Sequence, residues 1–173
     1  DGSKKAIGSA GMIKSMDLSP DGSFLLVETI KKPFSYLVPA SRFPYDVEIW
    51  NNAGKKVKTL AQIPLDENRP TGFDATVAGP RNISWRGDQP ATLYWVEAQD
   101  GGDAKVEIAE REIIYTLKAP FDGENQKLAS TPYRFGGIAW SDDNFAIFSE
   151  RWSKTRMDRK SVINPSNPKQ SPK

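Results

Sequence analysis

The sequence predicts an all-β fold, and three observations support this prediction. Short runs of β-branched and aromatic residues recur along the chain, and residues typical of turns bound each run. No long stretch has the apolar spacing of an amphipathic helix. Thirteen Gly and thirteen Pro are spread over 173 residues, as expected for many short strands joined by turns.

The expected strands fall into three consecutive groups. The first group comprises residues 12–18, 24–31, 47–51 and 56–60. The second comprises residues 81–86, 91–98, 104–109, 112–118 and 126–129, and the third comprises residues 137–141, 145–151 and 158–163. The sequence Asp-Gly-Gly-Asp at 100–103 predicts a hairpin turn, because Gly adopts positive φ without a steric penalty.

The three groups share an internal repeat. Each contains a strand that ends in Leu or Trp, a tight turn with Asp, and an apolar strand that ends near Glu. The strand-end residues are 67 and 55 residues apart, and an Asp that can accept backbone hydrogen bonds follows each one. The repeat positions are Leu18, Asp21, Trp85, Asp88, Trp140 and Asp143.

This repeat favours an incomplete β-propeller over a plain β-sandwich. Propeller blades repeat at about 40–50 residues, with insertions in loops, and each blade needs neighbours to bury its faces. The prediction is about two and a half to three four-stranded antiparallel blades. Blade 1 covers about 8–60, blade 2 about 81–130 and an incomplete blade 3 about 136–164, while 164–173 is a polar linker or the start of a missing strand.

Four segments carry a more specific resemblance. They read KKPFSYLVP with SRFP at 31–39 and 41–44, GPRNISWR at 79–86, ATLYWVEA with DGGD at 91–98 and 100–103, and ERW with KTR at 150–152 and 154–156. Together these segments resemble the N-terminal propeller of glutamyl endopeptidase-type members of the prolyl oligopeptidase family of serine peptidases. The resemblance extends from about Ile7 to Ile163.

The resemblance implies a propeller that sits over a C-terminal α/β-hydrolase domain with a Ser-Asp-His triad. This chain has no His and no Gly-x-Ser-x-Gly elbow, so no catalytic residue of the family maps onto it. We therefore expect a non-catalytic part of a serine-type endopeptidase or oligopeptidase, which gates and positions peptide substrate. The alternative is a stand-alone TolB-like propeller module for protein–protein binding.

The composition bears on other partners. No Cys is present, which excludes disulfides and Cys-ligated zinc, and no apolar run approaches the roughly 20 residues of a membrane helix. The expectation is no metal, no cofactor, no nucleic acid and no membrane partner. The sequence leaves the compartment open, because periplasmic and cytoplasmic proteins alike can lack Cys, and residues 1–5 have no apolar signal core; a periplasmic or exported location is favoured for a bacterial source.

The segment 31–42 is the candidate substrate contact. It combines the basic residues Lys31, Lys32 and Arg42 with Tyr36, a composition that suits recognition of an acidic side chain through charge-assisted hydrogen bonds. The alternative is a structural excursion between strands. A second expectation concerns association: an incomplete propeller leaves unpaired edges, such as residues 158–163, so self-association at high concentration is possible.

Overall fold

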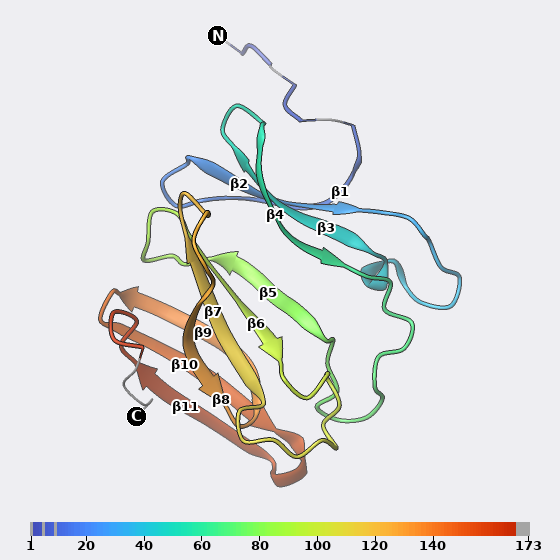
Figure 1. Ribbon diagram of the computed structural model, residues 1–173, viewed down its shortest axis with the longest axis vertical. Coiled ribbons are helices and arrows are strands. Elements are labelled where there is room, and N and C mark those ends of the chain that lie inside the picture. The colour runs from blue at the N-terminus through green and yellow to red at the C-terminus, as the bar shows by residue number, and fades with distance from the viewer. Residues whose placement is uncertain (1, 5, 9, 169–173) are drawn as a thin grey trace. The chain divides into compact units, whose positions relative to one another are not determined.

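The computed structural model describes residues 2–4, 6–8 and 10–168 (Figure 1). In this part the chain forms eleven strands in three antiparallel sheets of four, four and three strands. The helical segments in the described residues are two 3-10 turns of three residues each. The all-β prediction is therefore confirmed. The chain divides into two compact units, one up to Glu67 and one from Asn68 onward, which are described separately.

The first unit contains one four-stranded sheet. Its strands are β1 (Met12–Leu18), β2 (Phe24–Ile30), β3 (Tyr45–Asn51) and β4 (Lys56–Ile63), and each pairs with the next along the chain. The buried side chains of Val47 and Ile49 alternate with the less buried Glu48, as expected for a strand with two different faces. Every residue of β1 is exposed, including Leu18.

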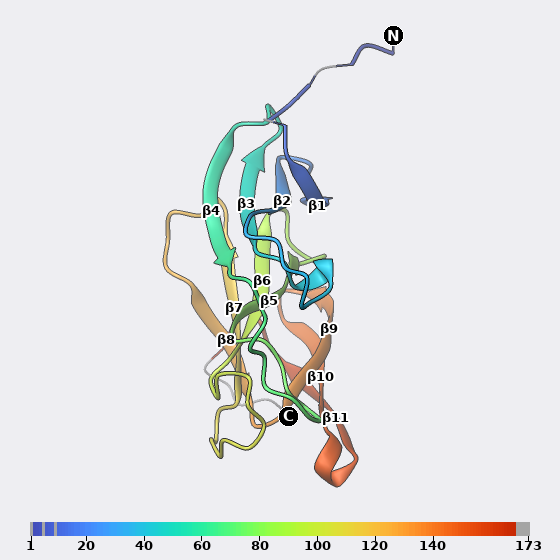
Figure 2. The same cartoon turned by 90° about the vertical axis from the view of Figure 1, so that its right-hand side faces the viewer.

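The second unit contains two sheets. The four-stranded sheet has β5 (Gly79–Trp85), β6 (Thr92–Ala98), β7 (Glu112–Lys118) and β8 (Gln126–Thr131) in chain order. The three-stranded sheet has β9 (Arg134–Asp142), β10 (Phe145–Trp152) and β11 (Met157–Ile163), with β10 in the centre. Both views show the three-stranded sheet alongside the four-stranded one (Figures 1 and 2).

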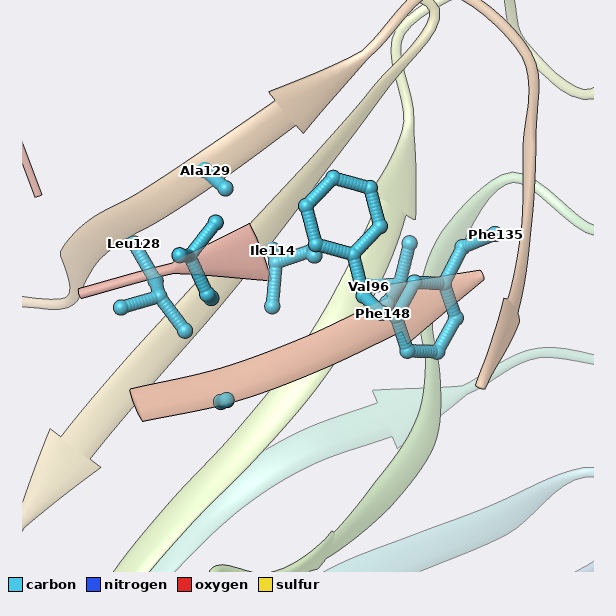
Figure 3. Close-up of a cluster of buried hydrophobic side chains, with 8 residues drawn as sticks. Val96, Ile114, Leu128, Ala129, Phe135 and Phe148 are labelled. Atoms are coloured by element: carbon cyan, nitrogen blue, oxygen red, sulfur yellow. The ribbon is translucent and has the colours of Figure 1, made fainter. Parts of the chain in front are cut away.

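A shared apolar core joins these two sheets. The four-stranded sheet and the three-stranded sheet each contribute four buried side chains, shown in Figure 3: Val96, Ile114, Leu128 and Ala129, and Phe135, Ala146, Phe148 and Ile163. Burial of one large apolar side chain stabilises a fold by about 1.5–3 kcal/mol, so this cluster is a major contribution to the stability of the second unit.

The expected strand at 104–109 is wrong. These residues belong to a loop between β6 and β7. The Gln99 amide donates to the Arg111 carbonyl at 2.8 Å and closes the base of this loop. Side chains take the place of a strand ladder: Asp100 Oδ1 accepts the Gly102 amide at 2.9 Å, and Arg111 Nη2 donates to the Val106 carbonyl at 2.9 Å. The turn at Asp100 therefore begins a longer folded loop between the paired strands β6 and β7, rather than a tight connection to a strand at 104–109.

The turn aspartates have three different environments. Asp21 accepts the Ser19 hydroxyl at 2.6 Å and the Ser23 amide at 3.0 Å, and these two bonds hold the pKa of its carboxyl below the usual value. Asp88 instead forms an ion pair with the Arg86 guanidinium at 2.6 Å. In the third turn the preceding Asp142 accepts a backbone amide, that of Asn144, at 2.8 Å.

Asp143 has a different role, because its carbonyl accepts the Ser166 amide at 2.8 Å. Residues 164–168 form a turn there, and residues 169–173, the end of the expected linker or further strand, lie outside the described residues. In the described part of the chain, none of the helical segments has the length and apolar character to cross a membrane.

Candidate functional site

The segment 31–42 forms most of the connection between β2 and β3. The Lys31 amide donates to the Pro44 carbonyl at 2.8 Å, which closes the base of the connection. Inside it, the rings of Phe34 and Phe43 stack with centroids 5.6 Å apart. The 3-10 turn Ala40–Arg42 follows, and the side chain of Tyr36 is fully exposed. The connection is thus ordered at its base and presents its aromatic tip to solvent.

The four candidate contact residues of this segment have different surroundings. Lys31 Nζ pairs with Asp46 at 3.2 Å, and the Arg42 carbonyl accepts the Asp66 amide at 3.1 Å. Lys32 and Tyr36 are exposed. Among the residues that the structure describes, no hydrogen bond or ion pair joins any two of the four. Substrate contact through Lys31, Lys32, Tyr36 and Arg42 therefore stays a prediction.

The second unit contains a buried network of charged side chains. It joins the loop after β6 to the first residues of β7 and β9, and all its carboxylates are inaccessible to solvent. The carboxylates are those of Asp100 and Glu112, and the guanidinium groups are those of Arg81, Arg111 and Arg134.

Arg134 is the centre of this network. Its guanidinium contacts Asp100 at 2.7 Å and Glu112 at 3.2 Å, and its Nε donates to the Asp74 carbonyl at 2.6 Å. Glu112 also accepts the Phe135 amide at 2.6 Å and pairs with Arg81. Because Arg134, on β9, contacts one other strand and two loops, it fixes their relative positions.

The electrostatic balance of the network keeps Asp100 ionised. Burial by itself would raise the pKa of this carboxyl. The hydrogen bonds and charge of Arg134, the Gly102 amide and the Arg111 guanidinium outweigh burial, so the pKa lies below its usual value. Three guanidinium groups face two carboxylates, which leaves one positive charge in excess.

A groove of about 680 Å³ adjoins this network. One wall is aromatic: the rings of Tyr133 and Trp152 lie 5.7 Å apart, and the Arg111 guanidinium lies 4.5 Å over Trp152. Phe73 is exposed in the same groove, and Lys154 contributes an ammonium group to its lining. Apolar walls with a few charged groups suit an extended peptide with apolar side chains.

Comparison with known proteins gives the decisive observation about origin. The chain is 43% identical over 175 residues to a probable chloroplastic glutamyl endopeptidase of Oryza sativa subsp. japonica and 42% identical to its namesake in Arabidopsis thaliana. This chain resembles a segment of glutamyl endopeptidases. The alignments cover all of this chain but only 19% and 18% of those proteins, so it spans about a fifth of their length. The resemblance to glutamyl endopeptidases that was predicted from the sequence is confirmed.

Solved structures and family models were also compared with the chain. An uncharacterized protein of Listeria monocytogenes EGD-e has a similar structure, with a TM-score of 0.51 and 14% sequence identity. The match covers 90% of this chain and 38% of that protein, and it supports the fold alone. No family model matches the chain.

The glutamyl endopeptidase resemblance did not identify the charge network or the groove, which sequence reasoning missed. Asp100 was expected only as a turn residue, and Arg134 was not singled out. One signal was present: Arg111 and Glu112 stand together at the start of an otherwise apolar strand, where adjacent charges indicate buried partners.

Proposed function

We propose that this chain is a non-catalytic, propeller-type part of a serine peptidase of the prolyl oligopeptidase family. In this role it gates and positions peptide substrate for a separate hydrolase domain of a longer protein. One observation carries the proposal: the whole chain matches about a fifth of relatives that are named as probable glutamyl endopeptidases. Most of each relative, and thus space for a catalytic domain, lies outside the matched segment.

The sheet topology supports the assignment of the three sheets as propeller blades. In each sheet the strands are antiparallel and adjacent in chain order, as in the blades of a propeller. The sheets of the second unit share one apolar core, which is how successive blades bury their faces. The outer edge of β11 would then receive a fourth strand, and its exposure would favour self-association.

Gating follows from size. A ring of blades leaves a passage that admits an extended peptide and excludes a folded protein, while the catalytic groups remain protected from bulk water. The aromatic groove and the exposed tip of the 31–42 segment supply two separate surfaces that a peptide could contact on this chain.

The test compares two substrates and two proteins. The full-length gene product should cleave a short fluorogenic peptide with a Glu site, and it should leave the same site uncut when the site lies inside a stably folded domain. The 173-residue chain should release fluorophore only at the buffer rate. Turnover by the chain that survives repurification would overturn the non-catalytic role. A gene product without any hydrolase domain would overturn the peptidase assignment and favour the stand-alone binding module.

A further inference from the structure

A second, smaller pocket of about 330 Å³ lies in the same unit as the charge network. Its lining is rich in arginine: Arg81 comes from β5, Arg134 from β9 and Arg151 from β10. Residues 74–76 and Asn82 complete part of the wall. None of the substrate contacts predicted from the sequence lies here.

Strand register brings these arginines together. Arg151 and Arg134 are directly opposite each other in the β9–β10 ladder, and like charges in such a position repel. In β5 the ladder is interrupted between Arg81 and Ser84, and Asn82 has a φ of 55°. This irregularity interrupts the regular alternation of the strand next to Arg81.

The positive charge of the pocket is only partly compensated. Arg134 is held by Asp100 and Glu112, and Arg81 reaches Glu112 through Nη2. The Nε of Arg81 is buried without a hydrogen-bond partner in the described part of the chain. Arg151 is exposed and forms no ion pair there. A buried donor without an acceptor is unfavourable, and an anion that accepts a hydrogen bond from it would remove this cost.

The acidic residue of the pocket wall, Asp74, forms no ion pair with these arginines in the described residues. Both carboxylate oxygens of Asp74 are engaged by Ser153: Oδ1 accepts the Ser153 hydroxyl at 2.8 Å, and Oδ2 accepts its amide at 2.8 Å. Asp74 meets Arg134 through its backbone carbonyl instead. Arg151 thus forms no ion pair in the described residues, although Asp158 lies directly opposite it in the β10–β11 ladder.

We propose that this arginine pocket binds a carboxylate group of a peptide. A planar carboxylate has two oxygens that match the donor fork of a guanidinium, and such charge-assisted bonds are among the strongest in proteins. Two of the three arginines, Arg81 and Arg134, already pair with Glu112, and Arg134 also pairs with Asp100, so the uncompensated charge is mainly that of Arg151 and matches a singly charged group. The proposal does not depend on the peptidase assignment, because it rests on the pocket alone.

The source of the carboxylate is an acidic side chain or a peptide C-terminus, and three peptides distinguish them. The first has one Glu and blocked ends, the second has Gln in its place, and the third has neutral side chains and a free C-terminus. Calorimetry on the full-length protein should detect saturable, salt-sensitive binding of the first or the third peptide. The Gln peptide should bind about tenfold more weakly, or worse, than the Glu peptide if the side chain is the source.

Variants of Arg151 test the pocket itself, because this exposed residue can be changed without opening the core. Arg151→Gln should weaken peptide binding about tenfold, and Arg151→Lys should weaken it less, because the charge remains while the fork is lost. The control is Lys118→Gln, which removes one exposed charge outside the pocket and should leave binding unchanged. Near-ultraviolet circular dichroism should match the wild type for all three variants.

Three results would overturn the proposal. One is the absence of saturable binding of every peptide at millimolar concentration. Another is equal affinity of wild type and Arg151→Gln for the peptide that binds. The third is tighter binding of inorganic phosphate than of the carboxylate peptides. That result would make the pocket a site for a different anion. These measurements record binding and require no cleavage. Each outcome therefore decides the proposal even if the peptidase assay fails.

Discussion

Arg134 forms a bidentate ion pair with Asp100: Nη1 donates to Oδ1 at 3.0 Å, and Nη2 donates to Oδ2 at 2.7 Å. Arg134 begins the three-stranded sheet, and Asp100 belongs to the loop between two strands of the four-stranded sheet. The pair therefore ties the two sheets of the second unit together at their edge, beyond their shared apolar core. Both side chains are buried, so the pair is shielded from solvent screening.

Replacement Asp100→Asn should destabilise the protein strongly. Removal of one partner of a buried ion pair leaves an uncompensated charge and costs about 3–5 kcal/mol. Because the pKa of Asp100 is lowered by folding, its stabilisation is present above the unfolded-state pKa of about 3.9 and is lost as the pH falls through the folded-state pKa. Urea unfolding at pH 7 and in acid should therefore show a smaller acid-induced loss in the variant. Equal losses in variant and wild type would contradict the assignment; exposed Asp122→Asn is the control.

Glu150 should have the opposite effect on stability. Its side chain is buried on β10, and Arg159 is its charged partner. Burial raises the pKa of this carboxyl, Arg159 offsets part of the rise, and the negative charge of Glu112 adds to it. A raised folded-state pKa means that stability from this group is greatest below the unfolded-state pKa of about 4.3 and decreases as the pH rises through the folded-state pKa.

Replacement Glu150→Gln should therefore flatten the decline of stability as the pH rises above about 4.3 and raise the melting temperature at neutral pH. Arg159 is about half exposed and can be solvated once its partner is neutral. Melting curves from pH 4 to pH 8 would show this, with exposed Glu107→Gln as the control. A melting temperature that falls at neutral pH would mean that the Arg159 pair outweighs the burial of the charge.

The strands were predictable from sequence, while the network was not. The alternation of apolar and charged residues in Asp46–Trp50 and the turn at 19–22 depend on residues close together in the sequence, so sequence reasoning located both. The pairing of Asp100 with Arg134 joins two separate sheets across 34 residues of sequence, which residue spacing does not reveal. The expected strand at 104–109 failed for a different reason. Its residue types suit a strand, but Arg111 binds the Val106 carbonyl, and Asp103 accepts the amides of Lys105 and Val106.

Gly102 should be far less tolerant of substitution than its neighbour Gly101. A Cβ at Gly102 would lie 2.1 Å from the Thr76 carbonyl oxygen, and the Gly102 carbonyl itself accepts the Thr76 amide at 3.0 Å. Gly101 also has positive φ, but a Cβ there has no atom within 4 Å. Gly101→Ala should thus cost only the strain of the left-handed conformation, about 1 kcal/mol. Gly102→Ala should cost clearly more in chemical denaturation, and equal losses would show that the contact with Thr76 can relax.

The repeat-related tryptophans should respond differently to the same substitutions. Trp85 is buried and lies 6.2 Å from Phe121, so Trp85→Ala should cost about 3–5 kcal/mol. Trp140 is only partly buried, with Tyr94 at 5.3 Å and the Arg86 guanidinium 4.3 Å from its ring, so Trp140→Ala should cost less.

Replacement by Phe separates packing from hydrogen bonding at the second position. The indole Nε1 of Trp140 is buried and has no hydrogen-bond partner in the described residues, and a buried unpaired donor costs about 1–3 kcal/mol. Trp140→Phe removes that donor and keeps an aromatic ring beside Tyr94, so it should be close to neutral or stabilising. Trp85→Phe should destabilise, because it reduces volume at a buried site. Equilibrium urea unfolding of the two variants decides: a loss at Trp140→Phe as large as at Trp85→Phe would show that the Trp140 indole nitrogen is satisfied in solution.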